Sequence, residues 1–287
     1  MIELFDEPMC DHTTFRVGGK AKRFLVPESA DDIIDAVKEL EEKKEEYIVI
    51  GNGSNLLVSD EGFDGTVILI SDKMNKITVE GNSIYAEAGA MLSAVARVAK
   101  ENSLSGFEFA SGIPGTVGGA IFMNAGAYDG EMKQVVNYVD VIENGILKKM
   151  TCDEMDFGYR HSIVMEKSMI VVGTCIDLVH GDEDAIKDKM KDLNKRRVEK
   201  QPLEYPSAGS TFKRPEGYFA GKLIQDSGLA GYSVGGAMVS PKHCGFVVNY
   251  NNATAKDIYR LIEDVTRIVY EKYSVKLEPE VRLIGVF

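Results

Sequence analysis

The stretch Phe109-Ala-Ser-Gly-Ile-Pro-Gly-Thr-Val-Gly-Gly-Ala-Ile-Phe-Met-Asn-Ala-Gly-Ala-Tyr128 is the part of the chain that decides how the fold is interpreted. It holds five glycines and one proline among apolar residues. Glycine lets a backbone approach a ligand closely, so such loops present N–H groups to phosphates, especially where a helix begins. No lysine follows the glycines, which excludes the P-loop of an ATPase or GTPase. The stretch predicts either a phosphate cradle or a tightly packed turn.

A second glycine-rich segment, Gly51-Asn-Gly-Ser-Asn55, follows the apolar run 47–50. It is not a Rossmann dinucleotide fingerprint, because that motif needs glycine at position 56, which is Leu56 here. By itself the segment fits a simple turn or a backbone cradle for a pyrophosphate. Two such segments in one region favour a dinucleotide with two phosphates.

Composition narrows the classes of function. The chain has 287 residues and a net charge of -12, and no basic stripe suited to nucleic acid is present. No apolar run reaches membrane-spanning length, and no signal peptide is recognisable at the N-terminus. The four cysteines and four histidines are scattered, so we expect reduced thiols, a cytoplasmic location and no metal site.

Local patterns predict a mixed α+β chain with a domain boundary near residue 200. Asn144-Gly145 between two apolar runs predicts a β-hairpin, and 182–200 predicts a charged helix. Two prolines then interrupt the pattern within 201–206. Beyond them, Thr254 is expected to cap a long amphipathic helix, and strands are expected at 210–213 and 280–287.

Three polar motifs are candidates for chemistry. Arg160, within Gly158-Tyr-Arg-His-Ser162, could bind a carboxylate or phosphate, or form a surface salt bridge. Ser210, followed by Lys213, could act as an acid if the lysine stabilised its oxyanion, or could simply begin a strand. Glu280 could act as an acid if its surroundings set its proton affinity, or could pair with Arg282 on one face of an edge strand.

The motifs occur in an order that resembles the UDP-N-acetylenolpyruvoylglucosamine reductase family of flavoenzymes, also called UDP-N-acetylmuramate dehydrogenases. The resemblance runs over nearly the whole chain, through 12–19, 50–57, 107–119, 123–128, 158–160, 208–213, 235–240 and 277–282. Several motifs in the same order make it highly specific.

The resemblance implies an α+β, vanillyl-alcohol-oxidase (PCMH) type FAD-binding fold with a C-terminal α+β substrate-binding domain. We therefore expect an FAD-binding region at 1–200, with subdomains at about 1–72 and 73–200, and a substrate-binding domain at 201–287. FAD is expected to bind non-covalently, because no histidine that could link a flavin lies in 111–119. The expected FAD-binding residues are Gly51, Asn52, Gly53, Ser54, Asn55, Ser111, Gly112, Ile113, Pro114, Gly115, Thr116, Gly118, Gly119 and Asn124.

The family's reaction uses NADPH to reduce FAD and then reduces the enolpyruvyl ether of a UDP-sugar to UDP-N-acetylmuramate, a peptidoglycan precursor for the cell wall. By resemblance, Arg160 holds the substrate carboxylate, Glu280 shares a proton with it or hydrogen-bonds it, and Ser210 protonates the enol carbon. Tyr159, Lys213 and Arg214 are expected to bind the carboxylate or the diphosphate. We expect a monomer with no membrane insertion.

Two departures from the family pattern bear on substrate binding. Many relatives have asparagine where this chain has Arg214, and the segment between Arg214 and Ser240 is too short for the loop that closes over substrate in one subclass. The chain therefore resembles the loop-free, type II subclass. Rival interpretations are an alcohol or sugar oxidase of the same fold and a flavin-binding protein without catalysis, but neither accounts for Arg160, Ser210 and Glu280 together.

Overall fold

The hairpin predicted around Asn144-Gly145 is confirmed in the computed structural model, which describes all residues from Met1 to Phe287. Strands β11 (Val136–Glu143) and β12 (Ile146–Thr151) pair in antiparallel register, with Glu143 opposite Ile146. Both turn residues have positive φ, 52° at Asn144 and 70° at Gly145. This conformation matches the twist of a two-residue hairpin and explains the Asn-Gly sequence.

The hairpin forms one edge of a five-stranded antiparallel sheet in the order β12-β11-β13-β7-β6. The other strands are β13 (Met169–Asp177), β7 (Ser83–Glu87) and β6 (Ile77–Glu80). All residues of β13 except the last are buried, as expected for the central strand of a covered sheet.

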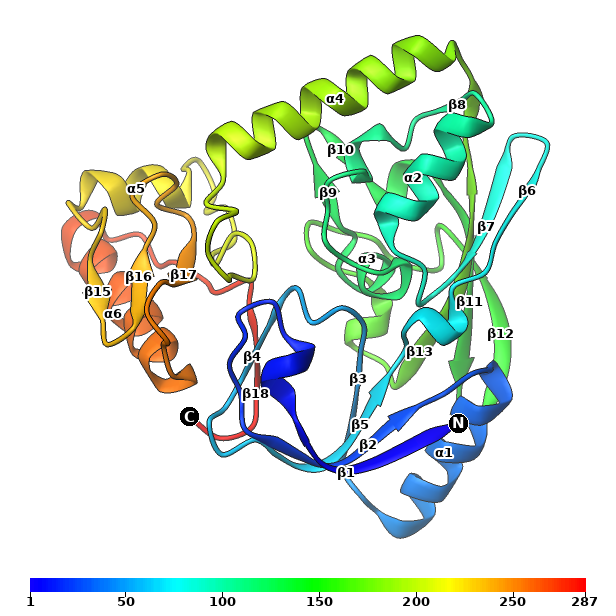
Figure 1. Ribbon diagram of the computed structural model, residues 1–287, viewed down its shortest axis with the longest axis horizontal. Helices are drawn as coiled ribbons and strands as arrows, with labels where there is room; N and C mark the ends of the chain where they lie inside the picture. Colours follow the sequence, from blue (N-terminus) through cyan, green and yellow to red (C-terminus); the bar gives the residue numbers. More distant parts are fainter. The chain divides into compact units, whose positions relative to one another are not determined.

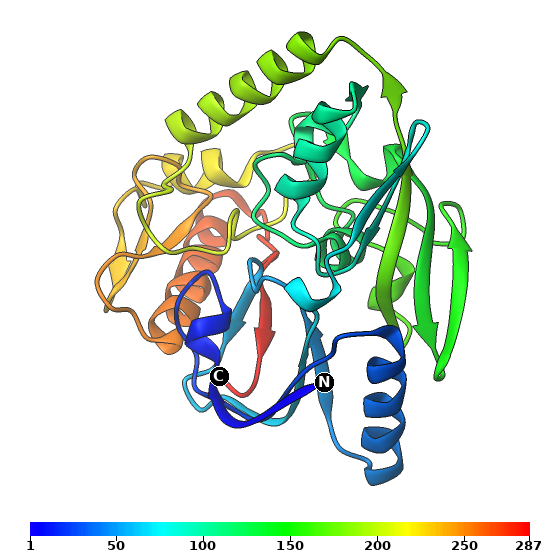
Figure 2. The same ribbon diagram turned by 45° about the vertical axis from the view of Figure 1, so that its right-hand side comes forward.

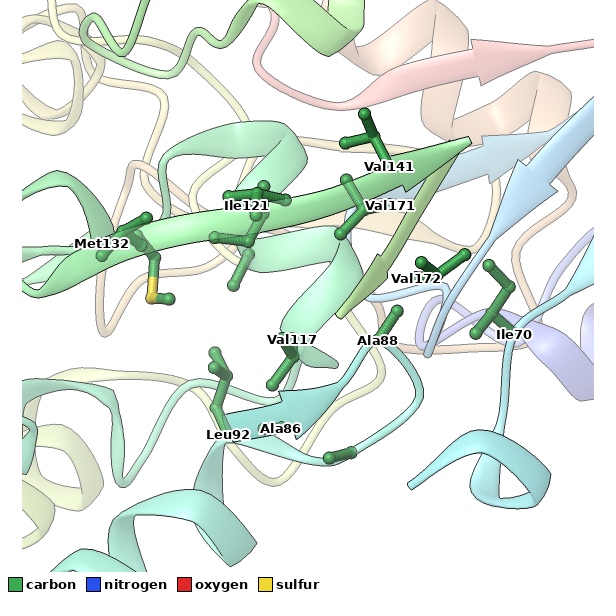
Figure 3. Close-up of a cluster of buried hydrophobic side chains, with 14 of the residues drawn as sticks. Ile70, Ala86, Ala88, Leu92, Val117, Ile121, Met132, Val141, Val171 and Val172 are labelled. Atoms are coloured by element: carbon green, nitrogen blue, oxygen red, sulfur yellow. The ribbon is translucent and has the colours of Figure 1, made fainter. Parts of the chain in front are cut away.

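Helices α2 (Leu92–Glu101) and α3 (Val117–Met123) contribute to the core beside this sheet. Figure 3 shows Val117 and Ile121 of α3 within the same cluster of buried side chains as Val171 and Val172 of β13. The glycine-rich stretch thus contains a buried helix, whose small and apolar side chains pack against β13 and β7.

The chain divides into two compact units that are discontinuous in sequence. The first consists of 1–4, 24–52 and 66–197, and the second of 5–23, 53–65 and 198–287. Both glycine-rich segments contribute to the first unit, but the Gly51–Asn55 segment continues into the second after Asn52. The division into subdomains at about 1–72 and 73–200 remains a prediction.

The first unit also contains α1 (Ala30–Lys43) and most of a long, strongly charged helix, α4 (Glu183–Lys200), which spans the predicted region (Figure 1). The Ser29 hydroxyl caps α1 by accepting a hydrogen bond from the Asp32 N–H at 3.1 Å. The remaining elements assigned largely to this unit are β3 (Tyr47–Ile50), β5 (Phe63–Leu69), β8 (Leu104–Ser105), β9 (Gly126–Ala127), β10 (Gly130–Glu131) and β14 (Val179–His180). A four-stranded sheet has the order β1-β2-β5-β3, with β1 (Ile2–Pro8) and β2 (Lys20–Val26).

The second unit is built around α6 (Ala255–Tyr273) and a three-stranded antiparallel sheet. Figure 2 shows α6, in orange to red, beside these strands. The Thr254 cap predicted for this helix is confirmed as a capping box with Asp257. The other elements are β15 (Ser233–Val234), β16 (Ala237–Val239), β17 (Val247–Asn249), α5 (Ala220–Asp226), β4 (Leu56–Val58) and β18 (Arg282–Ile284).

The C-terminal strand is shorter than the predicted 280–287 and pairs with a distant partner. β18 lies parallel to β4, with Arg282 opposite Leu56, so the end of the chain pairs with the segment that follows Gly51–Asn55. No helix of the chain combines the length and apolarity needed to span a lipid bilayer.

Candidate active site

In the first unit, the two glycine-rich segments lie side by side. The Asn52 side-chain amide donates a hydrogen bond to the Pro114 carbonyl at 2.7 Å. A Cβ placed on Gly51 would lie only 2.2 Å from Thr116 Oγ1. Glycine at position 51 is therefore required for the close approach of two loops whose hydrogen-bonded residues, Asn52 and Pro114, are 62 positions apart in sequence.

These adjoining loops expose backbone donors that the chain itself leaves unused. The N–H groups of Gly51, Asn52, Gly112, Gly115 and Thr116 donate no hydrogen bond to another group of the chain. Clustered backbone N–H groups of this kind suit an anionic ligand. The residues present therefore fit the diphosphate of a dinucleotide such as FAD.

The donors lie before α3, because the first turn of this helix is already bonded. Val117 and Gly118 donate to the carbonyls of Ala90 and Ala88, both at 2.8 Å, and Gly119 donates to Thr116 Oγ1 at 3.5 Å. A Cβ on Gly118 would lie 3.0 Å from Ala88 Cβ. The structure thus gives Gly118 and Gly119 packing and hydrogen-bonding roles within the chain, and their contact with a cofactor remains a prediction.

Asn124, the other expected FAD-binding residue in this stretch, is fully buried in a left-handed conformation with φ of 42°. Its side-chain amide donates to Glu131 Oε2 at 3.1 Å and to the Gly158 carbonyl at 2.9 Å. Its Oδ1 accepts from the Lys133 N–H at 3.0 Å. In this arrangement Asn124 connects the glycine-rich stretch to the segment that contains Arg160.

Arg160 occupies a tight turn in the first unit. Gly158 and His161 exchange backbone hydrogen bonds, so Tyr159 and Arg160 form the two-residue tip. Arg160 has a φ of 54°, and its guanidinium donates to the Gly126 carbonyl at 3.3 Å and lies 5.3 Å from the Tyr159 ring centroid. Tyr159 is exposed, so the tip presents an aromatic ring and a cation together.

In the second unit, Ser210 and Glu280 are brought close by backbone pairing. Phe212 forms an antiparallel bridge with Pro279, and the Glu280 N–H donates to the Thr211 carbonyl at 2.8 Å. The strand predicted at 210–213 is reduced to this bridge. Ser210 is exposed, and its hydroxyl makes no hydrogen bond with another group of the chain. It is therefore available to a substrate.

The last three residues of the Gly51–Asn55 segment lie in the second unit and contact this region. Gly53 has a φ of 60°, and a Cβ there would lie 1.9 Å from the His12 carbonyl oxygen, so only glycine fits. The Ser54 N–H has no acceptor in the chain. The Asn55 side-chain amide donates to the Glu280 carbonyl at 3.1 Å. An expected cofactor residue thus directly supports the backbone of an expected catalytic residue.

The other expected substrate-binding residues of this unit also have local partners. Lys213 forms an ion pair with Glu278 at 3.5 Å. The Arg214 guanidinium lies 4.0 Å from the ring centroid of Phe219, an exposed aromatic residue. Burial lowers the pKa of the Arg282 guanidinium on β18. The chain contains no group of three His, Cys, Asp or Glu side chains arranged to hold a metal ion.

Two residues with unsatisfied groups were not singled out from the sequence. The sequence of Lys195–Arg197 indicates only a basic run suited to a helix C-terminus, whereas in the structure the half-buried Arg197 has no partner in the chain. Gln201 has a buried Oε1 without a hydrogen-bond donor. No sequence pattern identifies such groups, because they are defined by the burial of side chains and the absence of neighbours.

Comparisons with known proteins agree with this arrangement. An FAD-binding domain model matches residues 21–146, and the model for the C-terminal domain of UDP-N-acetylenolpyruvoylglucosamine reductase matches 201–284. The reductase of Clostridium perfringens (strain SM101 / Type A) is 54% identical over 98% of this chain and 92% of its own length. The chain belongs to the UDP-N-acetylenolpyruvoylglucosamine reductase family. The reductase of Caldanaerobacter subterraneus subsp. tengcongensis is also 54% identical, over 98% and 93% of the two chains.

The solved structures support the same family membership. The crystal structure of UDP-N-acetylenolpyruvylglucosamine reductase (MurB) from Thermus caldophilus superposes with a TM-score of 0.84 and 34% identity, covering 99% of this chain and 98% of that one. The expected α+β, vanillyl-alcohol-oxidase type FAD-binding fold is confirmed. Like its family, the chain is an FAD-dependent oxidoreductase associated with peptidoglycan synthesis.

The contact between Gly51 and Thr116 leads to a prediction about the cofactor cradle. We expect Gly51→Ala to separate the two loops, to lower the free energy of unfolding by about 1–3 kcal/mol, and to weaken FAD binding at least about tenfold. Thermal unfolding and flavin fluorescence titration measure these effects. Thr116→Ala removes the side chain that caps α3 but makes room for the new methyl group. The double variant should therefore lose less stability and less FAD affinity than the sum of the two single variants. Additive losses would contradict the contact.

Proposed function

We propose that this protein catalyses the NADPH-dependent reduction of UDP-N-acetylenolpyruvoylglucosamine to UDP-N-acetylmuramate in the cytoplasm, as a monomer of the loop-free, type II subclass. The observation that supports this most directly is the backbone pairing of Thr211 with Glu280, beside an exposed and unbonded Ser210 hydroxyl. The proposed acid for carbon protonation and the proposed carboxyl for the substrate thus lie on two segments that are paired through their backbones. The 54% identity to named reductases over nearly the full chain supports the choice of substrate.

Bound FAD would supply the redox chemistry, accepting hydride from NADPH and delivering it to the enolpyruvyl methylene carbon. The unbonded N–H groups of Gly51, Asn52, Gly112, Gly115 and Thr116 would hold its diphosphate. Side chains of the protein would bind the substrate, stabilise the negative charge that develops on it and supply the proton.

We assign Arg160 to binding of the substrate carboxylate. Addition of hydride to the methylene carbon leaves negative charge on the neighbouring carbon, delocalised into the carboxylate as an enolate. A guanidinium bonded to that carboxylate stabilises the charge as it develops, which makes it a transition-state interaction. The turn formed by Gly158 and His161 limits the positions of Arg160 and so reduces reorganisation.

Ser210 then donates its proton to the enol carbon, and Glu280 shares a proton with the substrate carboxylate or hydrogen-bonds it. Thr211, between them, is fixed on both sides. Its N–H donates to the Gly245 carbonyl at 2.8 Å, and its Oγ1 accepts from the Val247 N–H at 2.9 Å. We assign the surface cations Lys213 and Arg214, with Tyr159, to the substrate carboxylate or the diphosphate.

The proposal predicts a yellow protein with a flavin absorbance maximum near ~450 nm. Under anaerobic conditions, NADPH should bleach this absorbance, and UDP-N-acetylenolpyruvoylglucosamine should restore it with formation of UDP-N-acetylmuramate. NADH serves as the control for coenzyme preference. Reoxidation by O₂ together with no response to the UDP-sugar would instead indicate an oxidase of the same fold and would overturn the proposed reaction.

A further inference from the structure

Arg197 differs from the adjacent Arg196 near the end of α4. Arg196 forms an ion pair with Asp192 at 2.7 Å, whereas Arg197 makes no ion pair or hydrogen bond with another group of the chain. Arg197 is also half-buried, and burial lowers the pKa of its guanidinium, with Tyr128 opposing the shift in part. A partly desolvated charge without a partner costs free energy unless something outside the chain compensates it.

The position of Arg197 indicates what that partner is. A Cβ placed on Gly112 would lie 3.2 Å from Arg197 Cδ and 3.4 Å from its Nη1. The side chain therefore lies against the loop whose N–H groups at Gly112, Gly115 and Thr116 have no acceptor in the chain. An uncompensated cation and uncompensated backbone donors thus meet in one place, all within the first unit.

We propose that Arg197 binds a phosphate of the FAD diphosphate at this loop. A guanidinium matches phosphate with two parallel hydrogen bonds and remains charged, so it can complement the neutral backbone donors. The inference rests on the proposed FAD-dependent function and adds a residue to its cofactor site. Arg197 acts here as a binding residue, remote in sequence from both glycine-rich segments.

The test compares cofactors that differ in their phosphates. Apoprotein is titrated with FAD and with riboflavin, which has the same ring system and no phosphate, and flavin fluorescence gives each dissociation constant. We expect Arg197→Met to lower the ratio of FAD affinity to riboflavin affinity by about 10- to 100-fold. Arg197→Lys should lower this ratio less, because lysine keeps the positive charge but lacks the planar pair of N–H donors. Arg196→Met, which removes the neighbouring paired cation, should leave the ratio unchanged.

Thermal unfolding provides a second readout that is independent of activity. Because Arg197 is uncompensated in the chain alone, Arg197→Met apoprotein should unfold at the same temperature as wild type or higher, while its stabilisation by added FAD should shrink. A purely structural Arg197 would instead lower the apoprotein unfolding temperature and leave the FAD to riboflavin ratio at the wild-type value, which would overturn the role. If wild-type protein bound no FAD at all, the cofactor assignment itself would fail. Normal wild-type binding with an unchanged ratio in Arg197→Met would overturn the assignment of Arg197 alone.

Discussion

Replacing Ser210 by alanine is expected to leave flavin reduction by NADPH at the wild-type rate while slowing turnover of the enolpyruvyl substrate by about 10²–10⁴-fold. The reason is that the hydroxyl is assigned only to protonation of the substrate carbon, after the cofactor has been reduced. Stopped-flow absorbance at the flavin maximum, under anaerobic conditions, measures the two half-reactions separately.

The structure also predicts that this substitution is harmless to the fold. The Ser210 hydroxyl is exposed and unbonded in the chain, so Ser210→Ala should change the free energy of unfolding by no more than about 0.5 kcal/mol. Ser207→Ala, in the same segment, is the matched control and should affect neither half-reaction. Equal slowing of both half-reactions by Ser210→Ala would rule out the assignment of Ser210 as proton donor.

Arg160→Met is expected to slow reoxidation of the reduced enzyme by its substrate about 10²–10³-fold, equivalent to about 3–4 kcal/mol of lost transition-state stabilisation. The loss would arise because charge on the substrate carboxylate grows as hydride is added, and the proposal assigns the guanidinium to that carboxylate. Arg160→Lys should recover part of the rate, since it keeps the charge without the planar pair of donors. Single-turnover rates at saturating substrate measure the effect on the chemical step.

The control for Arg160 is Arg97→Met, which removes an exposed cation paired with Glu101 at 3.2 Å on α2. It should leave both half-reactions unchanged. If Arg160→Met raised only the substrate concentration needed for half saturation and left the saturated rate intact, Arg160 would be a ground-state contact alone. That result would contradict its role in stabilising the enolate.

Much of the local structure could be predicted from the sequence, because it depends on short-range chemistry. The Asn144-Gly145 hairpin, the Thr254 cap of α6 and the charged helix α4 all depend on residues within one turn or a few positions of each other. The prediction of a strand at 210–213 was wrong, because its pairing depends on a residue that is distant in sequence. Its pairing partner is the segment around Pro279, which is far away in the chain and provides only a bridge.

The sequence by itself determined the family, the cofactor class and the three candidate catalytic residues, because these depend on residue types in a fixed order. Only the tertiary structure decided which glycine-rich backbone groups remain available. The N–H groups in the first turn of α3 are hydrogen-bonded within the chain. Those of Gly112, Gly115 and Thr116, like those of Gly51 and Asn52, have no acceptor in the chain. The tertiary structure also paired Arg196 and left Arg197 without a partner, a difference between adjacent and identical residues that arises from burial and contact. The Phe109–Tyr128 stretch by itself fits a phosphate cradle or a tightly packed turn, whereas the packing around it determines which of its backbone N–H groups have no acceptor in the chain.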